Sequence, residues 1–263
     1  MVNHQTSKLP VNDLIIRIED LSLQYSDGTE SLRNINLGIP QNAISVIFGP
    51  AGGGKSSLLR VLNRLNDLAD VTLLTGKVLF DGENVLDPKI DVISLRRRVG
   101  MVFARPVVLP MSIRENLTYG LEIAGVSNKT RLDTAVERSL NQAALWEEVK
   151  DRLDDPAVAL SGGQQQRLCL ARVLALEPEV ILLDEPTSGL DPISTGKVEV
   201  SLQELKVNYT IVLVPHSVQQ AARMADYAAF FLQGDLIEFA PGKELFLNPQ
   251  NQRTEDYVEG RFG

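Results

Sequence analysis

Apolar and polar positions change their spacing several times along this chain. Residues 13–25 (DLIIRIEDLSLQY) alternate as in a strand with one buried face, and residues 34–40 (NINLGIP) follow as a second strand. Three runs are apolar almost throughout, namely residues 43–49 (AISVIFG), 180–186 (VILLDEP) and 210–217 (TIVLVPHS). A strand that is apolar on both faces belongs in the middle of a parallel sheet. The pattern therefore predicts a parallel core sheet.

Helical spacing fills the segments between these runs. Residues 57–65 and 194–208 have helical character, and strands joined through helices pair in parallel by right-handed crossovers. Residues 112–125 and 131–149 carry apolar residues at i, i+3 and i+4, with no β-rich run beside them. We therefore expect an α/β core with a helical insertion.

These segments suggest a division of the chain into one domain with two short ends. We expect one domain over 13–240. Its core covers about 13–103 and 167–240, and its helical insertion covers about 104–166. A flexible lead over 1–12 precedes the domain, and a tail over 241–263, which begins with a short helix, follows it.

Composition excludes several classes of protein. Of 263 residues, 44% are hydrophobic and 23% are charged, as in an ordinary soluble globular domain. The formal net charge of −8 argues against a general nucleic-acid binder, which needs a basic face. No run of about 18 apolar residues is present, and the first residues lack the apolar stretch of a signal peptide.

Residues 49–57 (GPAGGGKSS) match the phosphate-loop pattern G-x-x-x-x-G-K-[ST] between a buried strand and a helix, the context that this motif requires. Backbone N–H groups of such a loop wrap a phosphate chain, and the helix N-terminus adds partial positive charge. Lys55 is expected on the β- and γ-phosphates, and Ser56 on Mg²⁺. The alternative is a turn that only joins strand to helix. The candidate phosphate-binding residues are Gly49, Pro50, Ala51, Gly52, Gly53, Gly54, Lys55, Ser56 and Ser57.

Two adjacent acids, Asp184 and Glu185, end the apolar run at 180–186. Ligands of open α/β sheets bind at the carboxyl ends of strands, where the phosphate loop also lies. We predict that Asp184 reaches Mg²⁺ and that Glu185 accepts a proton from the attacking water. His216 lies at the same edge and is predicted to contact the γ-phosphate or that water. Alternatively, the acids cap a turn and His216 is structural.

A second glycine-containing turn starts the segment 160–172 (LSGGQQQRLCLAR). Taken in order with GPAGGGKSS, ILLDEP, SGLD and PHS, it resembles the ATPase subunits of ABC transporters, over about residues 13–238. The resemblance implies two subunits packed head to tail, each nucleotide lying between the phosphate loop of one subunit and this signature turn of the other. The signature residues expected on the partner's ATP are Ser161, Gly162, Gly163 and Gln164. Ser161 is also a typical helix cap.

The resemblance further implies a fold, cofactors and partners. The fold is α/β: a P-loop NTPase (RecA-like) core, an N-terminal antiparallel β subdomain and an inserted α-helical subdomain. Tyr25 is expected to stack on adenine, and Asp191 to touch the partner's phosphate loop. ATP and Mg²⁺ are the expected cofactors. The expected setting is a homodimer at the cytoplasmic face of the membrane, peripheral, bound to permease subunits and served indirectly by an external solute-binding protein.

Stretches outside these shared motifs are similar to the ATP-binding subunit of bacterial phosphate importers. They include NRLNDL, LRRRVGMVF, PMSIRENLTYG and QQAARMADY. An importer of another solute stays open, because none of these stretches touches the transported ion. An ABC ATPase of DNA repair or ribosomes is disfavoured, since the chain lacks a second cassette, a long coiled coil and a basic surface.

One position departs from the family. Ala104 stands where the family has a glutamine that ligates Mg²⁺ and orients water, and a methyl group can do neither. A weakly hydrolysing regulatory subunit therefore remains an alternative. The following residues, 105–112 (RPVVLPMS), are apolar and bounded by proline, and we expect the segment 104–112 to face the permease.

Overall fold

The computed structural model describes residues 13–261, so the predicted lead over 1–12 lies outside the described residues. The N-terminal part of the chain forms an antiparallel sheet. Its strands lie in the order β2-β1-β4-β5, and their bounds are β1 Leu14–Tyr25, β2 Glu30–Pro40, β4 Val71–Phe80 and β5 Glu83–Asn84. Buried residues of β1 alternate with less buried ones on either side of a register shift, with Ile16 and Ile18 before it and Leu21 and Leu23 after it.

A second sheet of six strands, in the order β10-β9-β3-β8-β7-β6, forms the core. Its strands pair in parallel except for the antiparallel β9–β10 hairpin. Its strands are β3 Ile44–Phe48, β6 Val99–Val102, β7 Val180–Asp184, β8 Thr210–Val214, β9 Tyr227–Leu232 and β10 Asp235–Pro241. The three runs predicted as buried strands are β3, β7 and β8, side by side in its centre, which confirms the parallel core.

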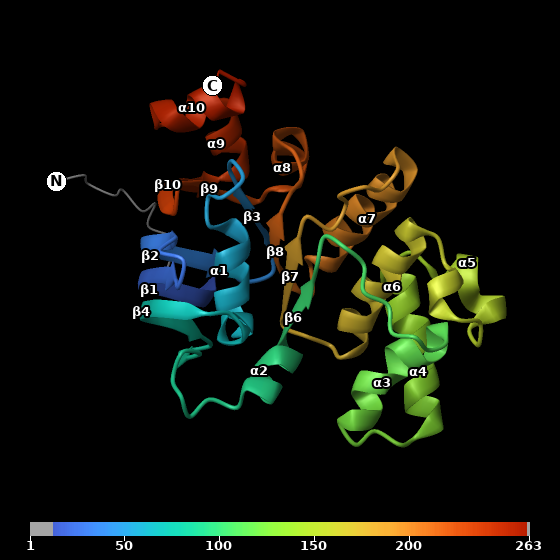
Figure 1. Ribbon diagram of the computed structural model, residues 1–263. Coiled ribbons are helices and arrows are strands. Elements are labelled where there is room, and N and C mark those ends of the chain that lie inside the picture. The colour runs from blue at the N-terminus through green and yellow to red at the C-terminus, as the bar shows by residue number, and fades with distance from the viewer. Residues whose placement is uncertain (1–12, 262–263) are drawn as a thin grey trace.

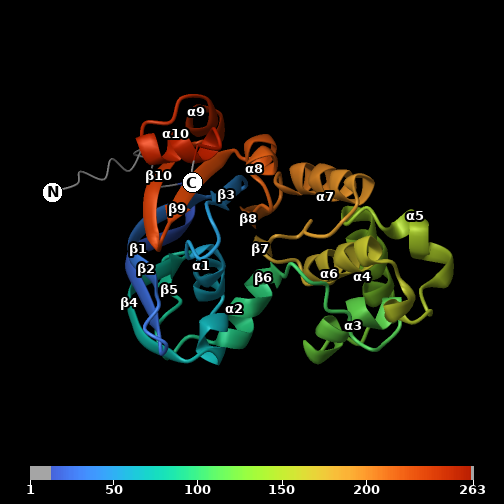
Figure 2. The ribbon, with the colours of Figure 1, turned by 45° about the horizontal axis from the view of Figure 1, so that its top comes forward.

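Helices cover both faces of this sheet. Helix α1 (Lys55–Leu62) lies between the two sheets, and its leucines pack with the inner faces of both. Because side chains of a strand alternate between faces, Ile47 of β3 joins this layer while its neighbours Val46 and Phe48 join the opposite layer. The other helices beside the sheet are α2 Val92–Arg98, α7 Pro192–Leu205 and α8 Val218–Met224 (Figures 1 and 2).

The helical insertion forms a separate lobe at one side of the molecule (Figures 1 and 2). Its helices are α3 Ile113–Ile123, α4 Lys129–Gln142, α5 Trp146–Val149 and α6 Gly162–Ala175. The single helix expected over 131–149 is wrong: α4 ends at Gln142, and Ala144 has a positive φ of 52° that breaks the helical path before α5. Helix α6 runs across the expected boundary at 166/167 and packs on α3 and α4.

The chain after β10 packs back onto the core. It forms α9 (Gly242–Leu247), as expected, and α10 (Gln252–Val258), for which no helix was predicted. Tyr257 of α10 lies against Phe230, with ring centroids 5.0 Å apart, and also packs near Phe48. Short 3₁₀ turns complete the described part of the chain at Leu65–Leu68, Lys150–Arg152 and Ala157–Ala159.

Candidate functional site

The phosphate loop joins β3 to α1, and backbone crowding explains its glycines. Gly49 has φ of 141°, and a Cβ there would lie 1.9 Å from the carbonyl oxygen of Phe231. Gly54 has φ of 96°, and its Cβ would lie 2.2 Å from the carbonyl oxygen of Ser31. Only glycine fits these two positions. Gly52 has a positive φ too but open space around it, so the loop has one free side.

Lys55, the first residue of α1, folds back over the loop. Its ammonium donates to the carbonyl oxygens of Gly49 (2.9 Å) and Pro50 (2.7 Å). Burial lowers the pKa of Lys55 from its ordinary value, and the carboxylates of Glu185 and Asp184 partly offset that effect. A cation bonded to neutral carbonyl oxygens can be taken over by a phosphate, whose oxygens are charged.

Ser56 and Asp184 meet at the carboxyl edge of the core sheet. The Ser56 hydroxyl donates to Asp184 Oδ1 at 3.0 Å, joining the start of α1 to the end of β7. Glu185 follows with a positive φ of 48°, and its N–H donates to the carbonyl oxygen of Val214 on β8 at 2.9 Å. The structure therefore brings together the residues predicted for the phosphates, the metal and the water.

His216 is exposed just past β8 and is tied to a residue that the sequence analysis missed. Both its backbone N–H (3.2 Å) and its Nδ1 (3.1 Å) lie against Gln220 Oε1. Gln220 is buried, and its Nε2 donates to Thr187 Oγ1 at 2.9 Å and to Glu199 Oε1 at 3.0 Å. Gln220 thus connects the His216 turn to the turn that contains Glu185. Its only sequence signal was its place in the QQAARMADY stretch.

Tyr25, at the end of β1, reaches the phosphate loop from the antiparallel sheet. Its hydroxyl donates to Ser57 Oγ at 3.0 Å, and the Ser31 hydroxyl donates to the same oxygen at 2.7 Å. Ser57 therefore has its oxygen engaged by the protein itself. Stacking of Tyr25 on adenine stays a prediction.

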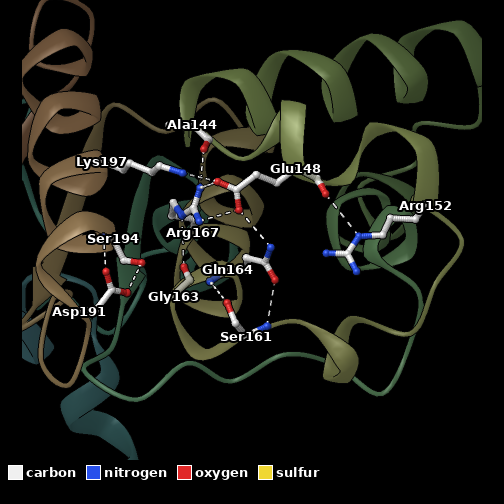
Figure 3. Close-up of polar contacts among 10 residues, drawn as sticks. All are labelled: Ala144, Glu148, Arg152, Ser161, Gly163, Gln164, Arg167, Asp191, Ser194 and Lys197. Atoms are coloured by element: carbon white, nitrogen blue, oxygen red, sulfur yellow. Dashed lines mark hydrogen bonds and ion pairs between the residues drawn. The ribbon is translucent and has the colours of Figure 1, made fainter.

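The signature turn lies in the helical lobe, and its polar groups bond within that lobe (Figure 3). Ser161 caps α6 in a capping box: its hydroxyl accepts from Gln164 N at 3.4 Å, and Gln164 Oε1 accepts from Ser161 N at 3.0 Å. Ser161 and Gly162 are exposed. The cap is therefore real, and it leaves the helix N-terminus facing solvent, where a phosphate can reach it.

Asp191 is the N-cap of α7. Its carboxylate accepts from the Ile193 and Ser194 amides and, at 2.6 Å, from the Ser194 hydroxyl. These bonds, that of the Ser194 side chain first, lower the pKa of Asp191. Its predicted contact with a partner's phosphate loop is untested within one chain.

Ala104 lies in the loop between β6 and α3, and side chains of α6 hold this loop by its carbonyl groups. Gln166 Nε2 donates to the carbonyl oxygen of Phe103 at 2.9 Å, and Arg172 donates to that of Val107 at 2.8 Å. The side chains of Phe103 and Val107 are exposed. Helix α6 thus holds the loop through its carbonyl oxygens, and the apolar side chains of Phe103 and Val107 face solvent.

The residues fit a magnesium site of the nucleotide-dependent kind. Mg²⁺ takes one or two protein oxygens and completes its shell with phosphate and water oxygens. Ser56 and Asp184 offer two such oxygens beside Lys55. Within residues 13–261 no group of three or more acidic, histidine or cysteine side chains could hold a metal by itself.

A known protein family shares the motifs of this site. The profile of the ABC transporter family matches residues 32–188, which include the phosphate loop, the signature turn and the acids at the end of β7. The chain belongs to the ABC transporter family. No helix within residues 13–261 is long and apolar enough to span a membrane.

Individual relatives cover almost the whole chain. Phosphate import ATP-binding protein PstB 1 of Streptococcus pyogenes is 51% identical over 96% of this chain and 100% of its own length. Among solved structures, CbiO1 of Clostridium perfringens, part of the ABC transporter complex CbiONQ, is 28% identical, with a TM-score of 0.78 over 95% of this chain and 97% of its own. The ATP-binding cassette MJ0796, a dimer bound to ADP and Pi, is 27% identical, with a TM-score of 0.75 over 87% and 99% of the two chains. These matches confirm the expected fold.

Proposed function

We propose that this chain is the ATP-hydrolysing motor of a membrane importer of inorganic phosphate. The observation that carries the ATPase part is the meeting of Lys55, Ser56 and Asp184 at one edge of the core sheet, beside Glu185. The 51% identity to a phosphate import ATP-binding protein over nearly the whole chain supports phosphate as the transported ion.

In this proposal each residue of the site has a distinct role. The loop amides and Lys55 bind the phosphates, and Ser56 and Asp184 hold Mg²⁺, which when bound neutralises phosphate charge. Glu185 lies half-buried at the edge where water attacks, and accepts the proton that the water loses. His216 stands on the neighbouring strand end, oriented through Gln220.

The proposed assembly is a head-to-tail homodimer. Ser161 and Gly162 at the N-terminus of α6 are exposed, and the related cassette MJ0796 forms a dimer bound to ADP and Pi. We place Ser161, Gly162, Gly163 and Gln164 on the nucleotide of the partner, and Asp191 near its phosphate loop. The loop 104–112, in which Val107 is exposed, docks on the permease, and the chain sits as a peripheral subunit at the cytoplasmic face of the membrane.

Sedimentation velocity on Glu185→Gln, with and without Mg-ATP, tests the ATPase and the dimer together. Loss of the base is expected to slow hydrolysis about 10³-fold while ATP still binds, so the closed dimer accumulates. ATP-dependent conversion of monomer to dimer is the expected result. Hydrolysis at the native rate would remove Glu185 from the role of base.

Transport by the assembled complex tests the solute. The chain is purified with its permease, reconstituted in vesicles that enclose Mg-ATP, and supplied with the external binding protein and the labelled solute outside. Uptake of labelled phosphate, unaffected by excess sulfate, is expected. Uptake of sulfate instead would assign the motor to another oxyanion.

A further inference from the structure

One carboxylate, that of Glu148 on α5, receives hydrogen bonds from three side chains on two other helices (Figure 3). From α6, Arg167 contributes two bonds (2.8 and 3.0 Å) and Gln164 Nε2 contributes one (3.0 Å). From α7, Lys197 contributes a bond of 2.5 Å. We call these four residues the Glu148 cluster. None of the four bonds belongs to the site around the phosphate loop.

Arg167 makes the cluster a fixed part of the lobe. Its side chain is only 3% exposed, and its remaining bonds go to the carbonyl oxygens of Ala144 (2.6 Å) and Gly163 (3.4 Å). A buried guanidinium is tolerated only when it is paired, so Glu148 is the counterion that Arg167 requires. Arg167, followed by Lys197 and Gln164, holds the pKa of Glu148 at about 2.

Gln164 connects the cluster to the signature turn. Its Oε1 accepts the N–H of Ser161, which closes the capping box, while its Nε2 donates to Glu148. Both ends of this amide are thus engaged, and Glu148 fixes the orientation in which Gln164 holds the start of α6. The carbonyl oxygen of Gly163 is held by Arg167 in the same cluster.

Lys197 connects the cluster to the turn before α7. One helical turn earlier, Ser194 lies so close to the signature that a Cβ on Gly163 would be 2.7 Å from its hydroxyl oxygen. That hydroxyl is bonded to Asp191. The face of α7 that carries Ser194 and Lys197 therefore meets Gly163 at the start of α6 and Glu148 on α5, and Asp191 is held at the same junction.

We propose that Glu148 is a positioning residue for the site in the opposite subunit: it locks the signature turn and the Asp191 turn into one unit that the partner's nucleotide meets. The proposal rests on the head-to-tail dimer of the proposed function. Donors that act on another chain's phosphate lose effect when they are displaced by even 1 Å, so their support must be rigid in advance. Glu148 supplies that support without touching the nucleotide.

The test compares Glu148→Gln with Glu147→Gln, both built in the Glu185→Gln protein. Glu147 is the matched control: it is the adjacent acid of α5, is mostly exposed, and within residues 13–261 pairs only with Lys150. Two quantities are measured, namely the affinity of the monomer for a fluorescent ATP analogue and the ATP concentration that gives half-maximal dimer in sedimentation velocity.

For Glu148→Gln we expect an unchanged monomer affinity and a rise of about tenfold in the ATP concentration needed for dimerisation. Glu147→Gln is expected to match the Glu185→Gln parent in both. A purely structural ion pair would not separate the two quantities. Equal dimerisation of Glu148→Gln and parent would overturn the role of Glu148 and leave the proposed function intact, whereas a parent that never dimerises would overturn both.

Lys197→Met decides the case in which Glu148→Gln does not fold. It keeps the pair of Glu148 with buried Arg167 and removes only the link to α7. A rise of roughly threefold in the ATP concentration for dimerisation, with monomer affinity unchanged, supports the proposal. Dimerisation like that of the parent would overturn the coupling between the two turns.

Discussion

The phosphate loop and the signature turn each place glycines at the start of a helix, but for different reasons. In the phosphate loop, Gly49 and Gly54 have positive φ and lie against main-chain oxygens, so the glycines shape the loop itself. In the signature turn, Gly162 has open space, and Gly163 is restricted by a side chain of another helix, Ser194. Positive φ and main-chain neighbours from β2 and β9 require the glycines of the first loop, whereas a side chain of α7 restricts Gly163 in the second.

Their cations differ in the same way. Lys55 is half-buried and bonded to neutral carbonyl oxygens, which a charged ligand can replace. Arg167 is buried and bonded to both oxygens of a carboxylate, which a ligand cannot easily replace. The phosphate loop therefore contains its own phosphate-binding cation. The signature turn instead offers backbone and hydroxyl donors, whose position is fixed by the buried Arg167 and its carboxylate partner.

The largest difference between the two regions is expected from removing the cation of the phosphate loop. Lys55→Met is expected to weaken ATP binding to the separate subunit by about 1000-fold, or ~4 kcal/mol, because each hydrogen bond to a charged group contributes 1.5–3 kcal/mol. Isothermal titration with ATP measures this loss. Lys150→Met, which removes an exposed lysine of the helical lobe, serves as control. Equal affinities for the two variants would contradict the assignment of Lys55.

Lowering the pH tests the carboxylate that supports the signature turn, that of Glu148. The pKa of Glu148 is lowered from 4.5 to about 2, chiefly by Arg167, so its stabilisation is complete above pH 4.5 and is lost as pH falls towards 2. Glu148→Gln is expected to lower the free energy of unfolding by about 3 kcal/mol at pH 7. At pH 3.5 the difference from the native protein shrinks by roughly 1 kcal/mol.

Urea unfolding at several pH values measures this difference. Glu147→Gln is the matched control, because its exposed partner Lys150 contributes little. A destabilisation by Glu148→Gln that stays constant from pH 7 to pH 3.5 would show that the charge of Glu148 is not what stabilises the lobe.

The two signature glycines give the next effect in size. Gly163→Ala puts a methyl group 2.7 Å from Ser194 Oγ, which cannot retreat without losing its bond to Asp191, and is expected to cost about 2 kcal/mol of unfolding free energy. Gly162→Ala, with open space around it, is expected to change stability by less than about 0.5 kcal/mol. Equal urea midpoints for the two variants would mean that α6 and α7 are not tightly packed here.

The smallest effect is expected at the loop before α3. Ala104→Gln restores an amide oxygen at the position where the family has one, and we expect ATP turnover of the assembled transporter to rise about tenfold, or ~1.4 kcal/mol in barrier. Turnover is measured against Mg²⁺ concentration, with Ala104→Leu as a control for size. An unchanged rate and Mg²⁺ dependence would show that this protein dispenses with the glutamine.

The strands that the sequence predicted and those that it missed differ in where their stability arises. Strands β3, β7 and β8 are buried on both faces, so their own residues mark them. Strand β4 is mostly exposed and depends on its pairing with β1, and β6 has only four residues. Such strands form because a partner distant in the sequence supplies hydrogen bonds, and local pattern carries little of that information.

The sequence by itself marked the phosphate loop, the cap at Ser161 and the acids at the end of β7, because each is a run of contiguous residues with a recognisable order. The sequence predicted Ser56 and Asp184 for the same metal, but only the tertiary structure decided that they are hydrogen-bonded directly across 128 positions of sequence, and that Gln220 Oε1 lies against the Nδ1 of His216. It also decided that the carboxylate of Glu148 accepts hydrogen bonds from side chains of both α6 and α7. The physical reason is that these contacts depend on where helices and strands cross, which is set by packing of the whole core.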